Sequence, residues 1–186
     1  MSNTERVAIF IDGSNFYHSV RDTFSLHDNQ INFPKLIEIL RNGRLLLGVY
    51  YYNAPLDIKF NKEVYWKQQK FFADLRKTPA LHIILAHMRK TEHDGKVFYS
   101  VKGDDIHLAI DMVSFAYENL YDTAILVSGD GDFEPAVKRA QKLGKKVENA
   151  YFSISRSSLL KQVCNKSMLL DDIIGNCLKN DDKKGK

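Results

Sequence analysis

The sequence lacks several features that would assign it quickly to a known kind of protein. Only two of its 186 residues are cysteines, Cys164 and Cys177, and neither has metal-ligand partners at a recognisable spacing. We therefore expect free thiols in a reducing cytoplasm, not a disulfide framework or a zinc site. No apolar run is long enough to span a membrane, and the N-terminus lacks the pattern of a signal peptide. These absences predict a cytoplasmic protein with no membrane partner.

Several motifs of phosphate-binding and metal-binding proteins are missing as well. No G-x-G-x-x-G follows a predicted strand, which argues against a dinucleotide-binding enzyme. A phosphatase that forms an aspartyl-phosphate would favour a second aspartate two residues after Asp12, and that position is Ser14. An adhesion module of the Asp-x-Ser-x-Ser type would need a serine where Phe16 stands. The net charge of +4 is too small to indicate nucleic acid binding by itself.

The chain does have a regular alternation of short apolar runs with amphipathic segments. The runs predict strands at residues 7–11, 45–52, 81–86, 96–101, 124–127 and 146–152, separated by helices. This alternation predicts an α/β protein, a three-layer α/β/α sandwich with a mostly parallel central sheet. We expect residues 81–86 and 96–101 to form a hairpin at a sheet edge, with its turn at residues 93–95. One domain should span residues 1–175, followed by a charged, disordered tail at residues 176–186.

Three of the predicted strands end in acidic turns that contain glycine. The turns read Asp-Gly-Ser-Asn at residues 12–15, Lys-Gly-Asp-Asp at residues 102–105 and Ser-Gly-Asp-Gly-Asp at residues 128–132. In open parallel sheets, ligands bind beyond the carboxyl ends of the strands. Each aspartate alone could be a helix cap or a turn residue. The joint pattern favours a site in which several carboxylates converge on one rim of the sheet.

A cluster of carboxylates needs a proton or a cation to assemble. Two carboxylates about 4 Å apart repel by roughly 4 kcal/mol at an effective dielectric of about 20. The turns offer only oxygen ligands, which favours Mg²⁺ or Mn²⁺ over zinc. Such a site could activate a water for in-line hydrolysis of a phosphodiester bond.

The helix predicted at residues 104–120 should present one of its aspartates to this cluster. At 100° per residue, Asp105 falls midway between the apolar positions Leu108, Ala109, Met112 and Ala116. We therefore expect Asp105 to point inward as the metal-linked carboxylate, with Asp111 as the second choice.

The three acidic motifs, in this order and spacing, resemble the NYN family, the LabA-like branch of PIN-domain nucleases. Residues 12–15, 102–111, 128–135 and 144–147 carry the resemblance, which extends from about Arg6 to about Asp172. It implies a PIN-like fold and a divalent-metal-dependent ribonuclease that hydrolyses phosphodiester bonds in single-stranded or structured RNA. It implies metal and catalytic roles for Asp12, Asp105, Asp130 and Asp132, a catalytic role for Asn15 and a further metal ligand in Asp111.

Two points leave the resemblance open to other outcomes. The family often has an aspartate in its C-terminal helix, about where Asn165 stands in this chain. The same fold could also serve as a catalytically weak regulatory module that binds RNA or protein. Such a module would bind RNA without metal-dependent turnover.

The helix predicted at residues 60–77 has two contrasting faces. An apolar stripe contains Phe60, Val64, Phe71 and Leu75, and the opposite face contains Lys59, Lys62, Trp66, Lys70 and Lys77. Lysines beside an aromatic side chain could track a phosphate backbone and stack a base. Alternatively, this face is solvated and Trp66 is covered by a neighbour or by the partner of a homodimer. Near the acidic turns, the candidates for nucleic acid contact are Lys102, Ser14, Ser128 and Tyr17.

Overall fold

The centre of the molecule is a six-stranded sheet in which every pair of neighbouring strands is parallel. The computed structural model describes residues 4–59, 61–93 and 96–179, with the backbone alone for residues 28, 87–93 and 96–102. The strands lie in the order β3-β2-β1-β6-β7-β8. They are β1 (Arg6–Asp12), β2 (Leu45–Asn53), β3 (Leu81–Leu85), β6 (Thr123–Val127), β7 (Lys146–Tyr151) and β8 (Lys166–Leu169).

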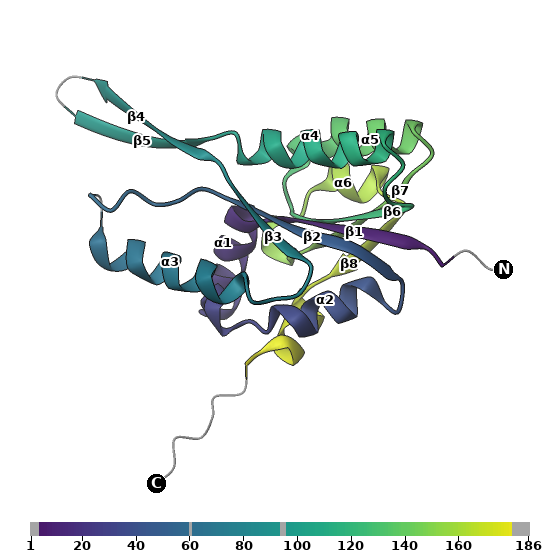
Figure 1. Cartoon of the computed structure of the whole chain (residues 1–186), viewed down its shortest axis with the longest axis horizontal. Helices are drawn as coiled ribbons and strands as arrows, with labels where there is room; N and C mark the ends of the chain where they lie inside the picture. The colour runs from purple at the N-terminus through teal and green to yellow at the C-terminus, as the bar shows by residue number, and fades with distance from the viewer. Residues whose placement is uncertain (1–3, 60, 94–95, 180–186) are drawn as a thin grey trace, which may run out of the picture.

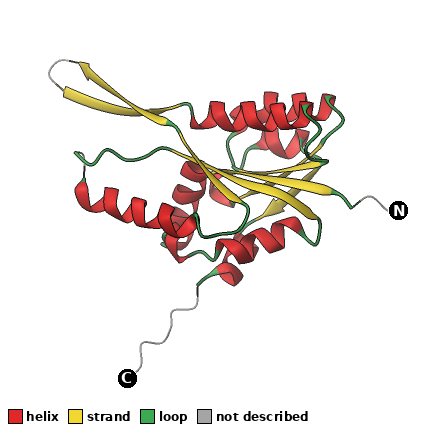
Figure 2. Ribbon diagram, in the orientation of Figure 1, coloured by secondary structure: helices red, strands yellow, loops and turns green. Residues whose placement is uncertain are grey.

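Helices cover both faces of this sheet, as Figures 1 and 2 show. One face carries α1 (Gly13–Phe24), α2 (Phe33–Arg41), α3 (Lys62–Leu75) and the short α7 (Asp171–Ile174). The other face carries α4 (Asp104–Tyr117), α5 (Glu134–Lys142) and α6 (Ser158–Val163). Successive residues of β1 enter the two cores alternately, Ile9 on one side and Phe10 on the other. The predicted three-layer α/β/α sandwich is confirmed.

The predicted edge hairpin is wrong in its partners. β3 pairs with β2 in parallel, as the edge strand of the central sheet. A second, antiparallel pair is formed by β4 (His87–His93) and β5 (Lys96–Lys102), and it projects away from the body (Figure 1). The sequence of β4 is polar and lacks the alternation by which a strand is recognised, so its pairing depends on β5 alone. The predicted turn lies partly at residues 94–95, outside the described residues.

The last part of the chain contains two elements that sequence periodicity did not indicate. β8 is four residues long and adds a strand beside β7, and α7 follows it. The chain then packs back against the start of α2, since Asn32 donates its backbone N–H to the carbonyl of Cys177 at 2.6 Å. Ile31 and Leu178 form an isolated bridge, and Cys177 is fully buried. The folded unit therefore extends to Lys179, beyond the predicted boundary at residue 175.

The strand order reverses direction next to β1, and this fixes where a ligand can bind. The chain steps outward from β1 through β2 to β3, then returns to place β6 on the other side of β1. The helices that follow β1 and β6 therefore leave on opposite faces, the point at which open parallel sheets bind their ligands, beyond the carboxyl ends of the strands. Asp12 ends β1 and Ser128 follows β6 at this point. In the described part of the chain, no helix is long and apolar enough to cross a membrane.

Candidate active site

Asp12 is a buried carboxylate at the junction of β1 and α1. Its side chain is 5% exposed, and it caps α1 by accepting the backbone N–H of Asn15 at 2.9 Å. The next position must be glycine, because a Cβ on Gly13 would lie 2.6 Å from the carbonyl oxygen of Tyr52. The buried strand β1 therefore ends in the Asp12 carboxylate, which is held at the rim of the sheet beside β6.

The turn after β6 fixes the second oxygen of Asp12. Ser128 is 2% exposed and donates its hydroxyl to Asp12 Oδ2 at 2.9 Å, while its oxygen accepts the backbone N–H of Asp130 at 3.0 Å. Asp130 in turn accepts the N–H of Asp132 at 2.9 Å and so caps a short 3₁₀ turn. A chain of hydrogen bonds thus connects the first acidic turn with the third.

Asn15 connects the start of α1 with the turn after β6 and the turn after β7. Its Oδ1 accepts the N–H of Gly129 at 3.0 Å and the hydroxyl of Ser155 at 3.3 Å. Gly129 lies so close to the backbone of Ser155 that no side chain fits at position 129, since a Cβ there would lie 1.9 Å from the Ser155 carbonyl oxygen. Asn15 therefore binds the turns that hold Asp12 and Asp130.

The first turn of α4 brings the remaining acidic residues to the same rim. Asp104 is 9% exposed, whereas Asp105 is more exposed than its predicted inward orientation implies, although its carboxylate interacts with Asp130 and Asp132 at the rim. Asp104 lies four residues before Leu108 and eight before Met112, on the ridge of α4 that packs on the sheet. Both carboxylates still interact electrostatically with Asp12.

The charges of this cluster raise the proton affinity of its members. Burial raises the pKa of Asp12 to about 6, against the hydrogen bonds from Asn15 and Ser128, and repulsion by Asp105 and Asp104 adds to the rise. The pKa of Asp105 is also raised, by burial first and then by repulsion from Asp104, Asp130 and Asp132. Within the described residues, no Lys or Arg side chain forms an ion pair with any member of this acidic cluster (Asp12, Asp104, Asp105, Asp130 and Asp132).

An oxygen-ligated divalent cation fits this donor set. A cation would supply the positive charge that the described side chains do not, and its ligands would all be carboxylate or hydroxyl oxygens. Within the described residues, no three or more of the acidic, histidine and cysteine side chains lie together in an arrangement that could hold a metal ion. This suits Mg²⁺ or Mn²⁺ better than a fully caged ion, because Mg²⁺ commonly keeps several waters and uses one or two carboxylates.

Asp111 lies apart from the acidic cluster. It accepts the hydroxyl of Tyr52 at 2.9 Å, and burial together with this carboxylate raises the pKa of Tyr52. Asp111 is not among the charges that act on Asp12 or Asp105. The structure therefore gives Asp111 a partner in β2 and does not support its predicted role as a metal ligand.

The residues predicted to touch nucleic acid near the turns have different surroundings. Ser128 is wrong as a contact residue, because it is buried and its hydroxyl is occupied by Asp12 and Asp130. Ser14 is exposed in the first turn of α1, and the ring of half-buried Tyr17 is covered by Arg21 at 5.6 Å. The side chain of Lys102 lies outside the described residues.

Two polar residues of the site were not anticipated. Asn149 on β7 is 2% exposed and donates its amide to the carbonyls of Leu126 and Ser128, at 3.1 and 2.8 Å. Ser155, in the turn after β7, donates to Asn15 and accepts the hydroxyl of Ser19 at 3.0 Å. Asn149 was detectable as the one amide inside the strand predicted at residues 146–152, whereas Ser155 lies in a serine-rich segment with no distinguishing pattern.

Asn165, where the resembled family often has an aspartate, lies away from the cluster. Its Oδ1 accepts the backbone N–H of Val147 at 2.8 Å and the amide of Gln141 at 3.1 Å. Val147 is near the beginning of β7, so Asn165 holds β8 to the amino-terminal end of its neighbour.

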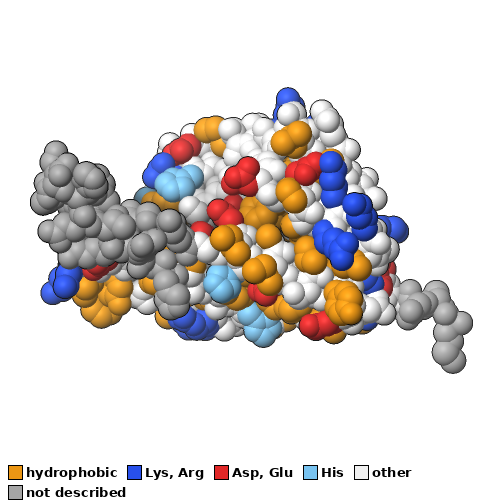
Figure 3. Space-filling model, turned by 90° about the horizontal axis from the view of Figure 1, so that it is seen from above, with side chains coloured by type: hydrophobic (Ala, Val, Ile, Leu, Met, Phe, Trp, Pro, Cys, Tyr) orange, Lys and Arg blue, Asp and Glu red, His pale blue; other side chains and the backbone are white. Residues whose placement is uncertain are grey.

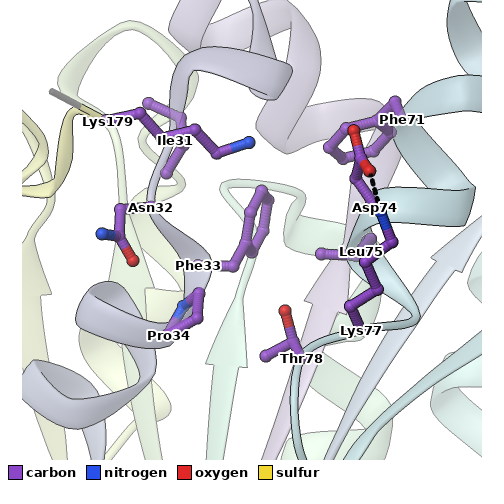
Figure 4. Close-up of a pocket in the computed structure, with 10 residues that line it drawn as sticks. All are labelled: Ile31, Asn32, Phe33, Pro34, Phe71, Asp74, Leu75, Lys77, Thr78 and Lys179. Atoms are coloured by element: carbon purple, nitrogen blue, oxygen red, sulfur yellow. Dashed lines mark hydrogen bonds and ion pairs between the residues drawn. The ribbon is translucent and has the colours of Figure 1, made fainter. Parts of the chain in front are cut away.

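The surface and the cavities separate the acidic cluster from other features. On the face that carries α4 and α5, acidic side chains gather near the middle and basic side chains gather toward one end (Figure 3). A cavity of about 250 Å³ lies between α2, the end of α3 and Lys179 (Figure 4). No member of the acidic cluster lines that cavity, so it is not part of this site.

Comparison with known proteins identifies the family. Residues 6–171 match the model of the NYN domain. The chain is 28% identical over 138 residues to the low amplitude and bright protein LabA of Synechococcus elongatus, a match that covers 72% of this chain and 66% of that protein. It is also similar to the crystal structure of a protein of unknown function, VPA0982 of Vibrio parahaemolyticus, with a TM-score of 0.73 and 25% identity over 92% of this chain and 96% of that one. Because the domain match covers most of the sequence and all three acidic turns, the chain belongs to the NYN domain family, in its LabA-like branch.

Proposed function

We propose that this chain is a divalent-metal-dependent ribonuclease that hydrolyses phosphodiester bonds in RNA. The observation that carries the proposal is the buried carboxylate of Asp12 at the carboxyl end of β1 beside β6, which interacts electrostatically with Asp104 and Asp105 and has no basic partner among the described residues. Ionising a buried carboxylate without a positive partner costs free energy, whereas the same carboxylate next to a cation can serve as a ligand. The nuclease-like character of the NYN family supports the same reading.

One or two of the carboxylates of Asp12, Asp105 and Asp130 would hold the ion together with bound waters, with Asp132 beside them. A bound Mg²⁺ or Mn²⁺ would supply an activated water and would stabilise charge at the scissile phosphate. Ser128 and the N–H of Asn15 keep the Asp12 carboxylate in one orientation and favour its ionised form. Asn15 and Ser155 keep the two acidic turns at a fixed separation.

Cleavage of a labelled RNA of about 20 nucleotides by purified protein, with Mg²⁺ or Mn²⁺, tests the proposal. Asp130→Asn should lower the cleavage rate at least about 100-fold, the upper end of losses for partners of metal ligands. Glu118→Gln is the matched control, since this exposed carboxylate at the other end of α4 lies about 20 Å from Asp104 at 1.5 Å per residue. It should cleave like the unchanged protein.

The proposal fails if the unchanged protein does not cleave RNA in either Mg²⁺ or Mn²⁺. It also fails if Asp130→Asn cleaves RNA as fast as the unchanged protein does. Binding of RNA without turnover would instead support the regulatory module that the same fold could form. Circular dichroism of both variants separates a lost reaction from a lost fold.

A further inference from the structure

The amino-terminal half of α3 presents a large exposed aromatic side chain between two lysines. Trp66 is the single tryptophan of the sequence and is 56% exposed, with Tyr65 edge-on to its ring at 5.2 Å. Lys62 and Lys70 lie four residues before and after it, so the three side chains form a row along one side of the helix. We call this the Lys62–Trp66–Lys70 row. Trp66 is not covered by the residues that the structure describes, which removes that part of the alternative considered from the sequence.

Among the described residues, the two lysines of the row lack a close acidic partner, although Asp74 acts electrostatically on Lys70. Other lysines of α3 are neutralised by acidic neighbours, Lys67 by Glu63 at 2.6 Å and, just beyond its end, Lys77 by Asp74 at 2.7 Å. In the described part of the chain, neither Lys62 nor Lys70 forms an ion pair. The row therefore combines an apolar ring with two cations outside any ion pair of the described residues, about 12 Å apart along the helix axis at 1.5 Å per residue.

Only the second half of α3 is packed into the core. Phe71, Phe72 and Leu75 are buried, whereas none of the residues from Lys62 to Lys70 is. The predicted apolar stripe is wrong for Val64, which is exposed, and Phe60 lies outside the described residues. The half that carries the row is therefore an exposed projection of the body.

This projection starts from the rim that carries the acidic cluster. Gln68 donates to the carbonyl of Ala54 at 3.0 Å and accepts the N–H of Leu56 at 2.8 Å, in the segment that leaves the carboxyl end of β2. β2 pairs with β1 so that Tyr52 is opposite Asp12. Figure 1 shows that α3 extends past the strand ends on the side where α4 begins. An RNA strand bound at the acidic cluster would thus reach α3 without crossing the molecule.

We propose that the Lys62–Trp66–Lys70 row binds single-stranded RNA, with Trp66 stacked on an unpaired base and the two lysines on flanking phosphates. This inference rests on the proposed ribonuclease function and names the form of its substrate. A base inside a duplex has no free face for an indole, so an aromatic platform selects unpaired nucleotides. A protein partner would favour a wider apolar patch, whereas two unpaired cations beside one ring favour a polyanion.

The single tryptophan makes the test direct. Unlabelled 12-nucleotide oligouridine, added in EDTA so that no cleavage occurs, should quench Trp66 fluorescence and protect the ring from acrylamide. A 12-base-pair RNA duplex should do neither. Trp66→Ala should weaken binding of the oligonucleotide about tenfold, measured by anisotropy of a labelled copy, and Trp66→Phe should restore most of it.

The lysines are tested by the salt dependence of binding. Lys62→Gln with Lys70→Gln should reduce the slope of log affinity against log salt by about 1.4, at ~0.7 for each phosphate contact on a single strand. Lys35→Gln with Lys161→Gln removes the same charge from exposed positions on α2 and α6 and should leave the slope unchanged.

Three outcomes would overturn the inference. The first is that oligouridine leaves Trp66 fluorescence unchanged and Trp66→Ala binds it as tightly as the unchanged protein. The second is that the RNA duplex quenches the fluorescence as strongly as oligouridine does. The third is that Trp66→Ala loses self-association in sedimentation but still binds RNA normally. The last outcome would assign the row to a homodimer interface. Because binding is measured in EDTA, quenching by oligouridine in a protein that never cleaves RNA would refute the proposed ribonuclease and leave RNA binding by this row in place.

Discussion

Asp12 experiences opposing demands, because its proposed role needs an ionised carboxylate in a place that disfavours charge. Its pKa rises from 3.8 to about 6 in the folded chain, so the folded state binds more protons than the unfolded state between these pH values. The stability that this proton contributes is complete below about pH 4 and is lost as the pH rises through 6. Above that pH, the ionised carboxylate lowers the free energy of unfolding of the metal-free protein.

Asp12→Asn should therefore be more stable than the unchanged protein at pH 7 in EDTA. The gain is at most about 3 kcal/mol, at ~1.4 kcal/mol per pKa unit, and should disappear near pH 4. Urea unfolding between pH 4 and 7.5 measures it. Asp122→Asn is the opposite control, because Arg6 lowers the pKa of Asp122 to about 2 and the pair stabilises the fold as pH rises. A variant Asp12→Asn that is less stable at every pH would contradict the burial argument.

The choice between Asp104 and Asp105 shows how far helix geometry reaches at single residues. The apolar face of α4 was predicted correctly, since Leu108, Met112 and Ala116 are buried. Averaging over that face selected Asp105, but the buried ridge runs in steps of four and begins at Asp104. At a helix start there is no preceding turn to define the direction of the face, so sequence periodicity cannot separate adjacent residues there.

Among the elements, long periodic segments were predictable and short paired ones were not. β1, β6 and α4 each carry enough apolar residues to indicate their own structure. β8 has four residues and exists because β7 offers it an open edge, with Asn165 fixing its first hydrogen bonds. Such strands depend on a partner distant in sequence, and no local pattern reports that partner.

Asn149 is the element-scale residue whose loss should be most informative. Its amide bonds the carbonyls of Leu126 and Ser128, and thereby ties β7 to the end of β6 where the site begins. Asn149→Ala would leave two buried carbonyls with fewer partners, at a cost of about 1–3 kcal/mol of unfolding free energy. Urea unfolding measures this cost. Gln141→Ala, which removes an amide from a more exposed position on α5, should cost less. Equal losses would show that burial of Asn149 is not what matters.

For the whole molecule, the sheet order decides the position of the acidic cluster more than any one motif does. The sequence placed acidic residues after three strands, yet β5 is not in the central sheet. The second acidic turn reaches the rim because α4 packs across β1 and β2, not because a strand delivers it there. The cluster could thus be predicted from the sequence, while the route of one of its members depended on tertiary packing.

A divalent cation that binds this cluster should stabilise the folded chain as a whole. At a concentration 100 times its dissociation constant, a ligand adds about 2.7 kcal/mol, which corresponds to roughly 5–10 °C in Tm for a chain of this size. Differential scanning fluorimetry in Mg²⁺ or Mn²⁺ measures the shift, with NaCl at equal ionic strength as control. Asp12→Asn should lose most of it, because the buried carboxylate links the ion to β1. If the Tm of the variant rises as far as that of the unchanged protein, the ion binds elsewhere and the rim between β1 and β6 is not its site.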